Sequence, residues 1–129
     1  VDCTGFRSLL LGKALNVPFV DKSKYLNVNS AVTRFVPYQS DEQAVATHTI
    51  STAQDAGWIW DIALQSRRGT GYVYSSDHID PQEAERVLKR YCGVEDCEQE
   101  LKHLSFKVGY REKFWHKNCA GISLNCTTA

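Results

Sequence analysis

Large side chains recur at every second position in the middle of this chain, and that spacing constrains the fold more than any other feature. Trp58, Trp60, Ile62 and Leu64 lie two residues apart, the period that places side chains on one face of a β-strand. Residues 70–75 form a second run rich in aromatic and β-branched side chains. The two runs predict a β-hairpin, and therefore an antiparallel sheet.

Polar and glycine residues connect the two runs. Residues 65–69 are expected to form the turn, and the Gly-Thr-Gly triplet at 69–71 is interpreted as part of it. A phosphate-binding loop is disfavoured because the triplet does not lie between a strand and a helix. Arg67 and Arg68 are expected to be solvated at the hairpin tip, with contact to an anionic cofactor as the alternative.

A helix start signal follows the hairpin. Residues 80–83 read D-P-Q-E, which provides an N-cap, a proline at the first helical position and a carboxylate for a capping bond. Gly93 stands where a left-handed residue ends helices. The apolar stripe between these signals has helical spacing and consists of Ala84, Val87, Leu88 and Tyr91, with Cys92 at its end.

Shorter elements are predicted elsewhere. A strand end at residues 1–3 leads into a turn and a short helix, whose apolar face is expected to carry Phe6, Leu9, Leu10 and Ala14. Pro37 is expected to end its strand or to place it at the edge of the sheet. Runs that predict strands lie at residues 31–38, 47–52, 106–108 and 119–124. Together these elements predict an α+β fold with two helices and an antiparallel sheet.

Composition excludes several classes of protein. Lys+Arg and Asp+Glu both number 15, so no net charge attracts the chain to nucleic acid or to a membrane surface. No apolar run approaches the length of about 18 residues that suggests a membrane span. The 129 residues contain no methionine, and we therefore expect an internal piece of a longer protein.

The cysteines and histidines favour neither disulfides nor a metal site. The five cysteines are odd in number and lack C-x-x-C spacing, which predicts reduced thiols in a cytoplasmic protein. The four histidines are scattered along the chain without an i, i+4 pair, so solvated or capping roles are expected.

Two motifs carry a family resemblance. Residues 2–10 read D-C-T-G-F-R-S-L-L, and residues 58–63 read W-I-W-D-I-A. The first resembles the D-x-[ST]-G-F-R-x-L-L segment of flavin-dependent tryptophan halogenases. The second is similar to their W-x-W-x-I-P signature, with Ala63 in place of proline. Further matches occur in the same order and cover nearly the whole chain, at residues 30–32, 36–37, 69–76, 106–109, 115 and 118–119.

The resemblance implies a fold of the flavin-monooxygenase type, an FAD/NAD(P)-binding layer joined to an antiparallel substrate-side sheet. Residues 1–129 would be a single incomplete segment of it. Residues 1–16 and 104–126 would belong to the flavin layer, and residues 29–93 would form the substrate-side sheet and helix.

The resemblance also implies an activity for the parent protein. FAD, reduced by a separate flavin reductase, would react with oxygen and with chloride or bromide to halogenate an electron-rich, tryptophan-like substrate. Trp58, Trp60 and Ile62 would line the flavin side of the tunnel and keep the substrate from reaching the flavin directly. Ser123 and Leu124 would lie beside the ribityl region, although relatives have glycine where this chain has Ser123.

No catalytic residue can be transferred by the resemblance. The G-x-G-x-x-G turn and the lysine that carries the halogen would lie before residue 1, and the Glu-Ser pair would lie beyond Leu124. The 129 residues alone are therefore expected to be inactive, and the oligomeric state cannot be predicted.

Three other interpretations stay open. Ala63 and Ser123 are compatible with a halogenase-like flavin monooxygenase. A non-catalytic α+β binding module would use its paired indoles to contact a ligand or partner. Trp58 and Trp60 could also be ordinary core residues of the hairpin. The flavin interpretation requires both indoles to project from one face of the same strand.

Overall fold

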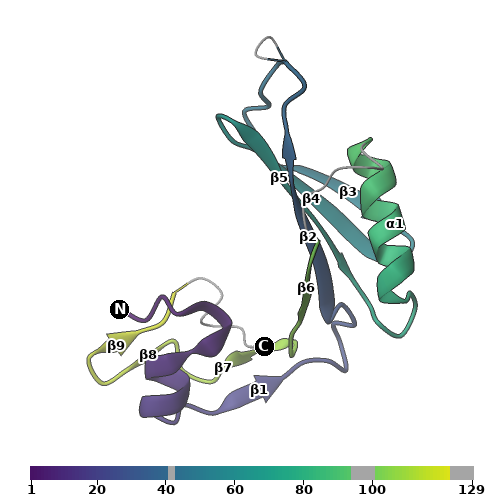
Figure 1. Ribbon diagram of the computed structural model, residues 1–129. Helices are drawn as coiled ribbons and strands as arrows, with labels where there is room; N and C mark the ends of the chain where they lie inside the picture. Colours follow the sequence, from purple (N-terminus) through teal and green to yellow (C-terminus); the bar gives the residue numbers. More distant parts are fainter. Residues whose placement is uncertain (41–42, 94–100, 123–129) are drawn as a thin grey trace. The chain divides into compact units, whose positions relative to one another are not determined.

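A computed structural model describes residues 1–40, 43–93 and 101–122 (Figure 1). The chain divides into two compact units. One unit contains Val1–Asn29 together with the segment that starts at Ser105, and the other contains Ser30–Leu104. The second unit is thus inserted in the sequence between the two halves of the first.

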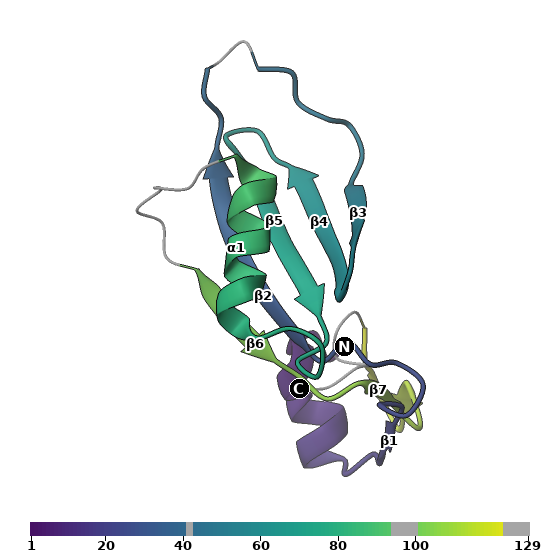
Figure 2. The same cartoon turned by 90° about the vertical axis from the view of Figure 1, so that its right-hand side faces the viewer.

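A five-stranded sheet forms the unit of Ser30–Leu104 (Figure 2). Its strand order is β3-β4-β5-β2-β6, and the pairs β3–β4, β4–β5 and β5–β2 are antiparallel. The predicted hairpin is therefore confirmed, and Pro37 ends its strand as expected. The strands are β2 (Ser30–Pro37), β3 (Ile50–Gln54), β4 (Gly57–Ala63), β5 (Arg67–Tyr74) and β6 (Lys102–Ser105).

The predicted helix, α1 (Pro81–Cys92), covers one face of this sheet (Figure 1). The Asp80 carboxylate accepts a hydrogen bond from the Glu83 N–H at 2.8 Å, and Gly93 ends the helix with a left-handed φ of 69°. Both cap predictions are confirmed. The core between helix and sheet contains Val32, Val36, Ile59, Tyr72, Tyr74, Ala84, Leu88 and Cys92.

Two predictions for the sheet are wrong in position. The Gly-Thr-Gly triplet at 69–71 lies inside β5 and not in the turn, because pairing with β4 already begins at Arg68, opposite Ala63. Strand β3 starts three residues after the predicted start at residue 47. Residues 55–56 form a tight connection that pairs Gln54 with Gly57. This connection sets the register between β3 and β4.

In its described residues, the other unit contains two short helices and two small two-stranded sheets. Antiparallel pairs join β1 to β7 and β8 to β9, and a parallel bridge joins Asp2 to Gly121. The small core consists of Leu11, Val17 and Cys119. The elements are η1 (Gly5–Arg7), η2 (Leu9–Ala14), β1 (Phe19–Asp21), β7 (Gly109–Arg111), β8 (Trp115–His116) and β9 (Cys119–Ala120).

The first helix buries a different side chain from those predicted. Leu11 is fully buried, whereas Leu9 and Leu10 are exposed within the described chain. The segment bends at Ser8, whose φ of 42° is left-handed, and continues as a π-helix. This bend and the wider helical turn rotate Leu11 inward, a change that simple 3.6-residue spacing does not anticipate.

The predictions near the end of the chain are also partly wrong. Phe106 and Val108 lie between β6 and β7 rather than on a strand. The Phe106 ring instead stacks on Phe6, with centroids 5.5 Å apart, and the Val108 carbonyl accepts a hydrogen bond from the Lys22 N–H at 2.7 Å. Of the last predicted strand, at residues 119–124, only Cys119–Ala120 form a strand, β9, in the described chain, and Ser123 and Leu124 lie outside the described residues.

Asp2 holds the start of the helical segment in place. Its buried carboxylate accepts hydrogen bonds from the N–H groups of Leu10 and Leu11, both at 2.9 Å, and from the Thr4 hydroxyl at 2.6 Å. Burial alone would raise the pKa of the Asp2 carboxyl. The hydrogen bonds from Thr4, Leu11 and Leu10 outweigh burial and lower this pKa to about 2.

Replacement of Asp2 by Asn tests this role. The folded pKa lies below the ordinary value of 3.8, so the carboxylate stabilises the fold above about pH 4, and this contribution is lost as the pH falls toward 2. Asp2→Asn is therefore expected to lower the free energy of unfolding by about 2 to 3 kcal/mol at neutral pH, and by less at pH 3. Urea unfolding followed by circular dichroism at both pH values measures the difference.

Asp21→Asn is the control for this experiment. The exposed Asp21 carboxylate accepts hydrogen bonds from Ser23, which lower the pKa of Asp21, but it orders only its own turn. A smaller loss of stability is expected. An Asp2→Asn effect that is the same at pH 7 and pH 3 would contradict the assigned role of the charge.

Candidate functional site

The face of the five-stranded sheet opposite α1 carries the two tryptophans of the W-I-W-D-I segment. Trp58 is 40% exposed, Ile62 is 41% exposed, and Trp60 is half-buried. The two indole centroids lie 6.1 Å apart, with the ring planes tilted by 58°. The prediction that both rings share one face of the strand is therefore confirmed.

The residues between them point the other way. Ile59 and Asp61 are buried on the α1 side of β4, so the strand alternates strictly between two faces. Neither indole belongs to the buried core of this unit. On the face opposite α1, the two indoles and the Ile62 side chain form an aromatic wall, which consists of Trp58, Trp60 and Ile62.

An ion pair on the buried side holds the backbone of this wall. The Arg68 Nε donates to the two Asp61 oxygens at 3.1 and 3.2 Å, a terminal guanidinium nitrogen also contacts the carboxylate, and the Tyr91 hydroxyl donates to it at 3.3 Å. The hydrogen bond to Asp61 raises the pKa of the Arg68 guanidinium. Because Asp61 lies between Trp60 and Ile62, the pair ties the strand to β5 and α1 at the wall.

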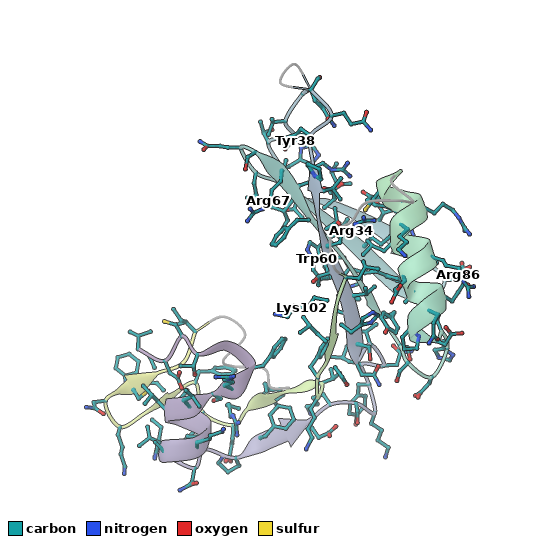
Figure 3. The ribbon with its side chains drawn as sticks, in the orientation of Figure 1. Arg34, Tyr38, Trp60, Arg67, Arg86 and Lys102 are labelled. Atoms are coloured by element: carbon teal, nitrogen blue, oxygen red, sulfur yellow. The ribbon has the colours of Figure 1, made fainter. Side chains whose placement is uncertain are left out.

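The expectation that the hairpin arginines are solvated is wrong for Arg68, whereas Arg67 is exposed as expected. Arg68 is in the ion pair, with 23% of its side chain exposed, and the Arg67 guanidinium lies over the Phe35 ring, 4.2 Å from the centroid. Figure 3 shows Trp60, Arg67 and Lys102 on the sheet face opposite α1. A hollow of about 790 Å³ lies along the sheet, and its lining includes Thr33, Phe35, Trp60 and Lys102.

Gly71 makes room for one of the indoles. It pairs with Trp60 across β4 and β5, and a Cβ added at Gly71 would lie 2.2 Å from two atoms of the Trp60 ring. The sequence shows the motif that includes Gly71, but it does not show the contact of Gly71 with Trp60. Only the strand register, which the sequence does not give, shows that this glycine faces Trp60.

Two further site predictions fall on residues that the structure does not describe. Ser123 and Leu124 lie outside the described residues, so their expected place beside a flavin stays a prediction. Within residues 1–40, 43–93 and 101–122, no cluster of three or more His, Cys, Asp or Glu side chains could hold a metal ion. Cys3, Cys92 and Cys119 are free thiols. No helix in these same ranges is both long and apolar enough to cross a membrane.

Comparison with known proteins defines the class. The family model for tryptophan halogenase matches residues 1–126, and the chain belongs to the tryptophan halogenase family.

Individual relatives support this assignment. The chain is 45% identical to the 7-chloro-L-tryptophan 6-halogenase KtzR of Kutzneria sp. (strain 744), over 97% of this chain and 24% of that protein. The crystal structure of a tryptophan halogenase from Shewanella frigidimarina matches with a TM-score of 0.87 and 42% identity, over 99% of this chain and 25% of that one.

A third relative is described as flavin-dependent. It is Tar14, a tryptophan C-6 flavin-dependent halogenase (chlorinase) from taromycin biosynthesis, with a TM-score of 0.83 and 44% identity. The match covers 99% of this chain and 25% of Tar14. The chain thus spans about a quarter of the length of these relatives.

Breaking the ion pair behind the wall tests its structural importance. Asp61→Asn leaves the partly buried Arg68 charge without its carboxylate, and we expect a loss of about 3 kcal/mol in the free energy of unfolding. The matched control is Glu83→Gln, which breaks the exposed Arg86–Glu83 pair, whose side chains are 65% and 37% exposed. This change is expected to cost less than about 1 kcal/mol.

Urea unfolding of the two variants and of the unmodified chain measures both losses. Equal losses for Asp61→Asn and Glu83→Gln would show that the buried pair does not hold β4.

Proposed function

We propose that the whole protein containing this chain is an FAD-dependent halogenase that acts on an electron-rich, tryptophan-like aromatic substrate. The observation that carries the proposal is the pair of half-exposed indoles on one face of β4, within a W-x-W-x-I segment of a tryptophan halogenase family member. The relatives' descriptions as tryptophan halogenases, one of them flavin-dependent, support the same conclusion.

The aromatic wall fits a flat, apolar ring system such as a flavin. Its two indoles and Ile62 present apolar surface on the face that α1 leaves open, and aromatic rings pack favourably in offset or tilted arrangements. Arg67 and Lys102, on the same face (Figure 3), would favour an anionic ligand. In this proposal residues 29–93 form the substrate side, and residues 1–16 and 104–126 belong to the flavin layer.

The residues of this chain would act by exclusion and orientation. When bound, reduced FAD supplies the oxidising chemistry, in which O₂, a halide ion and a proton yield oxidised FAD, water and hypohalous acid. Trp58, Trp60 and Ile62 would keep water and the aromatic substrate away from the flavin, because bulky rings fixed on a sheet leave little space between them. Ser123 and Leu124 would lie beside the ribityl chain.

Two further participants complete the proposal. A separate flavin reductase would supply the reduced FAD, and chloride or bromide would be the co-substrate. A halogenase-like monooxygenase is the second candidate, and Ala63 is the observation that favours it. Ala63 is the last residue of β4. It lies past the end of the pairing with β3, because Ile50, the first residue of β3, pairs with Asp61. It occupies the position of the proline in the W-x-W-x-I-P signature, so the backbone after Ile62 is less restricted.

An assay of the whole protein tests the proposed activity. Reduced FAD, O₂, tryptophan and either chloride or bromide are expected to give a halogenated product, detected by mass spectrometry. The 129 residues alone are expected to give none. A hydroxylated product in place of a halogenated one would support the monooxygenase. Halogenation by the isolated 129 residues would contradict the proposal that catalysis requires residues outside this chain.

Truncating one indole tests the wall. Trp60→Leu keeps an apolar side chain but shortens the wall, so reduced FAD is expected to give about tenfold less halogenated product per molecule oxidised. Tyr38→Leu is the control, since this aromatic residue of the same unit donates a hydrogen bond to the Leu64 carbonyl at 2.8 Å and is not part of the wall. Equal yields from the two variants would remove the wall from the proposed mechanism.

A further inference from the structure

The Trp60 indole occupies the space that a side chain at position 71 would need. An added Cβ on Gly71 would lie 2.2 Å from the Cζ2 and Cη2 atoms of Trp60, and 2.7 Å from its Cε2 atom. Real Cβ atoms do not approach other heavy atoms so closely. Even alanine at this position therefore requires the ring or the strand to move.

At Gly69, the neighbouring glycine of the same strand, a side chain would not clash. Gly69 pairs with Ile62, and a Cβ there would meet only the Ile62 carbonyl oxygen and the Phe35 ring, both at 3.9 Å. This is ordinary van der Waals contact. The two glycines lie on the same strand face, two residues apart, and differ in whether a tryptophan ring covers them.

The ring has to absorb the clash because the strands around it are fixed. Gly71 pairs with Trp60 on one side and with Thr33 of β2 on the other. Ile59 and Asp61, the neighbours of Trp60 in the sequence, are buried on the opposite face, where Asp61 is in the ion pair with Arg68. A shift of either backbone would disturb this core, so rotation of the half-exposed indole is the easier response.

We propose that Gly71 is a positioning residue for the Trp60 indole and thereby couples flavin oxidation to halogenation. This inference rests on the proposed function. Without a Cβ at position 71, the indole lies against β5 and stays close to Trp58. With a Cβ there, the indole would turn away from β5, and the wall would open where it is meant to separate substrate from flavin.

Gly71→Ala in the whole protein tests the inference, with Gly69→Ala as the matched control. Reduced FAD that reacts with O₂ without halogenating yields oxidised FAD and hydrogen peroxide, so both products are measured. Gly71→Ala is expected to lower the halogenated product per reduced FAD by about tenfold to a hundredfold, because a displacement of about 1 Å can have an effect of this size. Peroxide is expected to rise in compensation.

A spectroscopic measurement follows the indole itself. The two rings, 6.1 Å apart, are close enough to couple their excited states and give a paired signal in far-ultraviolet circular dichroism. Gly71→Ala is expected to weaken this signal, and Gly69→Ala is expected to retain it. A general loss of structure would instead change the backbone signal and the unfolding midpoint.

Removing the indole should remove the need for glycine. The atoms in conflict with a Cβ at position 71 belong to the six-membered ring of Trp60, which Trp60→Leu deletes. The double variant Trp60→Leu/Gly71→Ala is therefore expected to match Trp60→Leu alone in product per reduced FAD. Such non-additivity indicates that the two residues act through one contact.

The outcomes separate the inference from the proposed function. A halogenating wild-type protein whose Gly71→Ala variant keeps the paired signal and the wild-type product yield would overturn the inference and leave the function intact. So would equal losses in Gly71→Ala and Gly69→Ala. A wild-type protein that makes no halogenated product would overturn the proposed function. The proposed role of Gly71 in coupling would then fail as well.

Discussion

The strict alternation of β4 between two faces is the constraint on which the rest of the sheet depends. Ile59 and Asp61 face α1 and anchor the strand through burial and through the ion pair with Arg68. Trp58 and Trp60 must then face the opposite side. A shift of one residue would bury both indoles and expose the charged pair, so the core that stabilises the sheet also determines the orientation of the proposed site.

The same pairing gives neighbouring residues very different tasks. In the Gly-Thr-Gly triplet, Thr70 is buried and donates a hydrogen bond to the Arg34 carbonyl at 3.1 Å, whereas Gly71 faces the open side beneath Trp60. Stability is thus concentrated on the helix-covered face and the proposed chemistry on the open face. Substitutions on the helix-covered face are therefore expected to lower stability. Substitutions on the open face are expected to lower the coupling of flavin oxidation to halogenation.

Local signals allowed much of this unit to be predicted from the sequence. The D-P-Q-E start and Gly93 defined α1, and the two-residue spacing of the tryptophans defined β4, because both depend on near neighbours along the chain. The contact of Gly71 with Trp60 could not be predicted, since it depends on the strand register. The buried Leu11 was missed for a similar reason, because Asp2 and the bend at Ser8 set the orientation of its helix.

The insertion of one unit into the other has a kinetic consequence. Ser30–Leu104 contains hairpins and a capped helix, and such short-range contacts close quickly. The other unit joins Asp2 to Gly121 and β1 to β7. Its two halves are separated in the sequence by the whole of Ser30–Leu104, so these contacts are long-range. During refolding, the sheet that bears the indoles should therefore become protected against hydrogen exchange first and bring the distant halves of its neighbour into reach.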